Sequence, residues 1–150
     1  MKNIAYTLAI STLLLTANVF AVEKFTPLPQ ILNEANSNND AVAYTYILKR
    51  CGALMGSVAG YESNDDRADA KKLVKINNEG AEFFITTALN ANKNLKQQTN
   101  DGLIKDIQEM TTVYLDNFKK NRLLNANIFT GFVEQDYKVC TDIYKGSIKK

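Results

Sequence analysis

Two cysteines, Cys51 and Cys140, are the residues of this sequence with the clearest chemistry. Their separation of roughly 90 residues excludes a CxxC redox or metal motif, and an even cysteine count in an oxidising compartment implies a bridge. Because two cysteines allow one connectivity within the chain, we predict a Cys51–Cys140 disulfide that stabilises the fold by about 4–5 kcal/mol in the chain-entropy model. Two free buried thiols and a bridge between chains are the alternatives.

One acidic residue, Asp136, falls on the apolar side of its expected helix, one turn before Cys140. An ionised carboxylate inside a core is costly unless it is paired. We therefore expect Asp136 either at the rim of the apolar face or paired with a tyrosine hydroxyl, Lys49 or Arg50. A second carboxylate cannot be placed beside it for acid–base catalysis of the glycosidase kind.

The candidate ligand-facing residues are polar or aromatic side chains on inward helical stripes: Tyr44, Asn77, Asp136, Tyr137 and Tyr144. Aromatic residues at helical spacing are more often core residues than pocket walls. A buried amide such as Asn77 is expected to be hydrogen-bonded to a neighbour. We predict that these residues face inward, and only in second place that they line a ligand pocket.

Much of the usual catalytic and metal-binding chemistry is missing, because the chain has no histidine. This excludes Ser-His-Asp and Cys-His nucleophilic machinery and removes the usual zinc, copper and haem ligands. The sequence contains no GxGxxG or GxxxxGK[ST] glycine loop for binding phosphates. The formal net charge of +2 lacks the basic excess of a nucleic-acid binder. We therefore predict no metal site, no cofactor, no nucleic-acid partner and no enzymatic activity.

Residues 1–21 have the three-part pattern of a secretory signal peptide. Lys2 is the basic start, residues 4–15 are apolar, and residues 19–21 (VFA) resemble a cleavage site. The apolar run is shorter than the roughly 20 residues that span a bilayer, and an uncleaved amphipathic first helix is the alternative. We expect cleavage after Ala21, no transmembrane segment in the mature chain, and a periplasmic or secreted bacterial protein.

Apolar residues spaced three and four apart predict four long helices, over 40–61, 65–95, 101–124 and from 128 or 130 to 148. Residues 22–39 are expected to form an extended leader, apart from one possible helical turn over 30–35, because Pro27 and Pro29 disfavour helix just before them. Both cysteines fall at the centre of an apolar stripe. The predicted fold is all-α: a four-helix bundle, mainly antiparallel, over residues 40–150, with its first and last long helices linked by the disulfide.

Three glycines, Gly52, Gly56 and Gly60, recur every fourth residue beside the apolar stripe of the first long helix. Each lowers helix propensity by up to about 1 kcal/mol relative to alanine. They would allow a neighbouring helix to approach closely, but we interpret them as a tolerated flank of small residues.

Three functions are compatible with these features. The first is a non-enzymatic module that binds a protein partner or assists an envelope process, which needs only a stable bundle with polar outer faces. The second is a small-molecule carrier with a cavity in the bundle core. The third is an enzyme that uses Asp136 and a tyrosine as acid and base, and it ranks last because the usual catalytic residues are missing. The sequence leaves the oligomeric state open.

Overall fold

The computed structural model describes residues 25–149, and within them the chain forms five helices and no strand. The predicted all-α class is confirmed for this part of the chain. The helices are, in order, α1 (Leu28–Asn38), α2 (Ala41–Glu62), α3 (Ala68–Leu95), α4 (Asn100–Asn125) and α5 (Phe132–Ile148). The predicted signal peptide, residues 1–21, lies outside the described residues.

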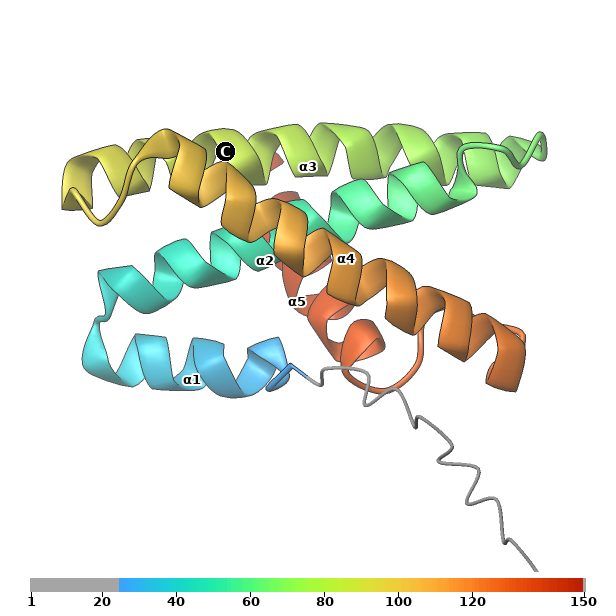
Figure 1. Ribbon diagram of the computed structural model, residues 1–150, viewed down its shortest axis with the longest axis horizontal. Coiled ribbons are helices and arrows are strands. Elements are labelled where there is room, and N and C mark those ends of the chain that lie inside the picture. Colours follow the sequence, from blue (N-terminus) through green and yellow to red (C-terminus); the bar gives the residue numbers. More distant parts are fainter. Residues whose placement is uncertain (1–24, 150) are drawn as a thin grey trace, which may run out of the picture.

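Helix α2 is the centre of the fold, because each of the other four helices packs against it. In Figure 1, α3 runs alongside α2, and α4 crosses α2 obliquely. Helix α5 packs against α1 and α2 and, to a smaller extent, against α3. The disulfide joins α2 to α5, which are the first and last of the predicted long helices. The mainly antiparallel four-helix bundle is not confirmed, since the described chain places its helices around one central helix.

Helix α1 corrects the extended leader that we predicted for residues 22–39. It begins directly after Pro27, and Pro29 lies in its first turn, where a missing N–H costs no hydrogen bond. The two prolines therefore mark the start of a helix. Leu28 and Ala35 are buried, and α1 packs on α2 and α5. Tertiary packing thus stabilises a helix of 11 residues that would be marginal alone.

The four long helices begin and end within a few residues of the predicted positions. The Asp40 carboxylate accepts hydrogen bonds from the N–H groups of Val42 and Ala43 at 2.9 and 3.1 Å, and it thereby caps α2. The last helix differs most, since α5 begins at Phe132 rather than at 128 or 130. Gly131 precedes it with a φ of 62°, a backbone conformation that favours glycine.

Helices α2 and α3 approach each other closely at two of the three spaced glycines. A Cβ atom on Gly52 would lie 2.9 Å from Ile85 Cγ1. One on Gly56 would lie 3.8 Å from Ala81 Cβ, whereas at Gly60 no such atom lies within 4 Å. The interpretation of a tolerated small flank does not hold at Gly52, where a side chain would force Ile85 of the neighbouring helix to shift.

Candidate functional site

The disulfide lies where the middle of α2 meets the middle of α5. Cys51 and Cys140 have Cα atoms 5.3 Å apart, and both residues are fully buried. The predicted bridge is thus confirmed. The two cysteines are 89 residues apart in the sequence, so the bridge holds together two helices that are distant along the chain.

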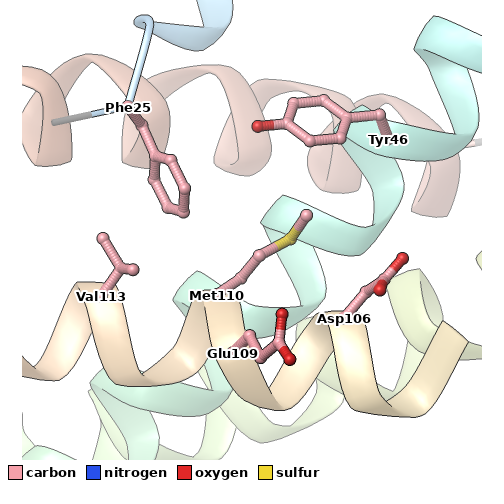
Figure 2. A pocket seen from close by; sticks show the side chains of 6 residues that line it. All are labelled: Phe25, Tyr46, Asp106, Glu109, Met110 and Val113. Carbon is pink, nitrogen blue, oxygen red and sulfur yellow. The ribbon is translucent and has the colours of Figure 1, made fainter. Parts of the chain in front are cut away.

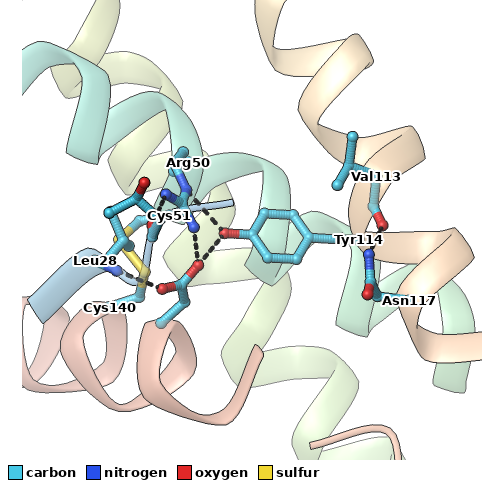
Figure 3. Close-up of polar contacts among 9 residues, drawn as sticks. Leu28, Arg50, Cys51, Val113, Tyr114, Asn117 and Cys140 are labelled. Atoms are coloured by element: carbon cyan, nitrogen blue, oxygen red, sulfur yellow. Dashed lines mark hydrogen bonds and ion pairs between the residues drawn. A yellow bond between two sulfur atoms is a disulfide. The ribbon is translucent and has the colours of Figure 1, made fainter. Parts of the chain in front are cut away.

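Beside the bridge, polar side chains from three helices meet in the core, as the dashed lines around Arg50 and Tyr114 show in Figure 3. Arg50 of α2 forms an ion pair with Asp136 of α5, and both side chains are 0% exposed. The Tyr114 hydroxyl of α4 donates to Asp136 Oδ2 at 2.6 Å and accepts from Arg50 Nε at 3.2 Å. We call Arg50, Tyr114, Asp136 and the disulfide the junction. Asp136 is therefore paired with an arginine and a tyrosine, two of the partners that we expected.

Residues 25–28, which we call the strap, cover the junction where the chain enters α1. The Leu28 N–H donates to Asp136 Oδ1 at 2.7 Å. Arg50 Nη1 donates to the carbonyl oxygen of Thr26 at 2.6 Å. The strap thereby ties the start of α1 to charged groups of both α2 and α5.

Burial changes the acid–base properties of the junction. It raises the pKa of the Asp136 carboxyl, while the Arg50 charge and the hydrogen bond from Tyr114 act against that rise. Burial also raises the pKa of the Tyr114 hydroxyl well above its ordinary value of 10.0, so this hydroxyl stays protonated and donates to Asp136. Both oxygens of Asp136 accept hydrogen bonds from the protein itself. The junction therefore holds the helices together, and both oxygens of Asp136 are buried and bonded to groups of the protein.

The other predicted ligand-facing residues lie apart from the junction. Asn77 Nδ2 of α3 donates to the Tyr137 hydroxyl of α5 at 3.0 Å, so the fold brings these two side chains together. Tyr144 packs against two phenylalanine rings of α3, and Tyr44 donates to an asparagine side chain of α1. The five candidates thus occupy four separate places rather than one pocket. Ligand binding by any of them stays a prediction.

A groove lies between the strap, α2 and α4, with a volume of about 260 Å³. Figure 2 shows its side chains facing one another across the gap between α2 and α4. The residues that line it are Phe25, Tyr46, Asp106, Glu109, Met110 and Val113. Sequence reasoning missed this groove. The α4 residues have the three-and-four spacing of one helix face, but Phe25 and Tyr46 reach the groove from other elements.

Phe25 belongs to the groove and also covers the junction. Its ring centre lies 4.2 Å from Arg50 Cζ, and the ring centre of Tyr46 lies 5.7 Å from the same atom. Both distances are within the range of a cation–π interaction. The aromatic wall of the groove therefore rests on the guanidinium group of the junction.

The two carboxylates of the groove have different partners. Asp106 accepts from Lys49 Nζ at 2.7 Å and from Gln98 Nε2 at 3.0 Å, and these hydrogen bonds lower the pKa of Asp106. Glu109 lies 3.9 Å from Lys105 Nζ, and the two side chains are 69% and 76% exposed. Such exposed pairs contribute little to stability. Glu109 is therefore a carboxylate of the groove that a guest molecule can reach.

Within residues 25–149, the Cys, Asp and Glu side chains form no group of three or more that could hold a metal ion. None of the five helices found there combines the length and the apolar character needed to cross a membrane. The chain matches no protein-family model, no curated protein and no solved structure. A functional proposal therefore rests on the geometry of the junction and the groove.

Proposed function

We propose that this protein is an exported, non-enzymatic module that binds another protein in the bacterial periplasm or outside the cell. Export is supported by the signal-like pattern of residues 1–21 and by the disulfide, since disulfides persist in oxidising compartments. A role without catalysis is supported by the junction, where Asp136 is fully buried and bonded to groups of the protein itself.

The observation that carries the proposal is the groove between α2 and α4. Its lining combines two aromatic rings, a methionine and a valine with two carboxylates. Aromatic residues and methionine are enriched at protein interfaces, and methionine adapts to partner surfaces of different shape. Val42, one helical turn before Tyr46, is 58% exposed and extends the apolar surface along α2.

The groove is of a size that can hold a single side chain of a partner. Its volume of about 260 Å³ is below the roughly 300–1,000 Å³ of typical small-molecule pockets. A protein interface instead places a few anchoring side chains in hollows of this kind and excludes water with the surface around them. The groove and its apolar extension fit that arrangement.

Photo-cross-linking from inside the groove tests this proposal. The photoreactive residue p-benzoylphenylalanine, placed at Val113, is expected to give a discrete cross-linked product in the cells that export the protein. The same residue at Lys138, an exposed position of α5, is the matched control and is expected to give none. No product from position 113, or equal products from both positions, would contradict the proposal.

A further inference from the structure

We infer that the partner presents a lysine or an arginine next to an apolar residue, with the basic side chain at Glu109 and the apolar one inside the groove. This inference rests on the proposed function and adds the chemistry of the partner. Three features of the groove support it: its apolar floor, its unequal carboxylates and its aromatic wall.

The apolar floor consists of Met110 and Val113 of α4, and Phe25 faces them across the gap. Figure 2 shows these three side chains directed into the same gap, Phe25 from the strap and the other two from α4. Burial of apolar surface stabilises a complex by roughly 25 cal/mol per Å² before the costs of association. A single aliphatic or aromatic side chain of a partner is the guest that this floor accommodates.

The two carboxylates of the groove, Asp106 and Glu109, differ in exposure and in how firmly a lysine holds them. This difference determines which charge a guest meets. The Lys49–Asp106 pair is internally neutralised, and its lysine side chain is only 11% exposed. Glu109 is 69% exposed, and its contact with Lys105 joins two exposed side chains that are able to separate. Among the described residues, the lining of the groove includes two carboxylates and no lysine or arginine, so a guest that enters beside Met110 meets acidic side chains that a basic side chain complements.

The aromatic wall acts in the same direction as Glu109. Ring faces attract cations, and the rings of Phe25 and Tyr46 each have one face toward the Arg50 guanidinium, so a basic side chain of the guest would meet the ring face turned to the groove. An acidic partner would instead place its carboxylate near Glu109 and Asp106, and like charges across an interface oppose binding. Charge complementarity thus selects a basic segment.

Titration with short peptides tests the inference. The probes are acetyl-Leu-Lys-Leu-amide and acetyl-Leu-Glu-Leu-amide, added to the full processed chain, and the readout is the NMR shifts of the Met110 and Val113 methyl groups. We expect the lysine peptide to bind about tenfold more tightly than the glutamate peptide, since an attractive charge contact of about threefold is replaced by a repulsive one of similar size. Equal affinities would overturn the inference and leave binding at the groove in place.

Two charge variants assign the effect to Glu109. Glu109→Gln is expected to weaken the lysine peptide about threefold, as loss of one exposed ion pair predicts. Glu79→Gln removes the same charge from α3, where Glu79 pairs with Lys75 at 4.0 Å, and is expected to leave the affinity unchanged. Equal losses in both variants would overturn the assignment.

A free organic cation is the remaining occupant that the test separates. If n-butylammonium chloride shifts the Met110 and Val113 methyl signals as strongly as the lysine peptide at equal concentration, the groove binds a free cation and the inference is overturned. If cross-linking from position 113 succeeds but neither peptide shifts these signals, the inference fails while the proposed function stands. If that cross-link is absent, the proposed function itself fails.

Discussion

The junction and the groove both combine aromatic and charged side chains of α2 and α4, yet the partners of those charged groups differ. In the junction, Asp136 is 0% exposed and both of its oxygens accept hydrogen bonds from the protein. In the groove, Glu109 is 69% exposed and has one long contact to a lysine. Residue type alone therefore does not tell a carboxylate that stabilises the fold from one that can bind a partner. A charged group whose partners all come from its own chain stabilises the fold, whereas one left at the surface of an apolar hollow is open to a guest.

Removal of the disulfide is expected to have the largest effect on the junction. Replacement of Cys51 and Cys140 together by Ser should lower the free energy of unfolding by about 4–5 kcal/mol, because a loop of this length constrains the unfolded chain strongly. Urea unfolding in non-reducing buffer measures the change. An unchanged midpoint would show that the bridge does not stabilise the fold.

Asp136→Asn should have the next largest effect. The substitution leaves the Arg50 guanidinium buried without its counter-charge, and breaking a buried ion pair in this way costs about 3–5 kcal/mol. Asp142→Asn, an exposed position on the same helix, is the control and should change stability by less than about 0.5 kcal/mol. The junction would lose its structural role if the two variants unfolded at the same urea concentration.

Acid should weaken the ion pair between Lys49 and Asp106 beside the groove. Hydrogen bonds from Lys49 and Gln98 lower the pKa of Asp106 below its ordinary value of 3.8. Ionised Asp106 therefore contributes fully to the free energy of unfolding above pH 3.8, and this contribution is lost as the pH falls through the lowered pKa. Because the Lys49–Asp106 pair is partly exposed, we expect it to contribute less than about 1 kcal/mol to the free energy of unfolding.

The comparison of the wild type with Asp106→Asn isolates this small effect. Unfolding free energies measured from about pH 6 to about pH 2 should converge for the two proteins as the pH falls, because protonated Asp106 no longer gains from Lys49. A stability difference that stayed constant over this range would contradict the assignment.

Much of the fold could be predicted from the sequence, because amphipathic spacing shows which face of a helix is buried. It does not show what that face packs against. The crossing of α2 by α4 therefore could not be predicted from periodicity. Helix α1 was missed for a related reason. It is short and begins with prolines, and it is stabilised by the burial of Leu28 and by contacts with α2 and α5 rather than by its own pattern.

The candidate site was only partly predictable. The cost of a buried charge indicated that Asp136 needs a partner, and Arg50 was among the expected ones. The choice of Tyr114 could not be predicted, because its helix approaches Asp136 only in the folded chain. The groove could not be predicted for the same reason, because Phe25 and Tyr46, which line it together with α4, lie far from α4 in the sequence.

Two substitutions on α4 test the contrast between junction and groove most directly. Each changes one polar group: Tyr114→Phe removes a hydroxyl from the junction, and Glu109→Gln removes a charge from the groove. We expect Tyr114→Phe to lower the free energy of unfolding by about 1–3 kcal/mol, as loss of a buried hydrogen-bonding group does, and to leave the affinity for acetyl-Leu-Lys-Leu-amide unchanged. Glu109→Gln should change stability by less than about 0.5 kcal/mol and weaken that peptide about threefold. If folded Tyr114→Phe loses as much affinity as Glu109→Gln, or if Glu109→Gln loses as much stability as Tyr114→Phe, the division into a structural junction and a binding groove is wrong.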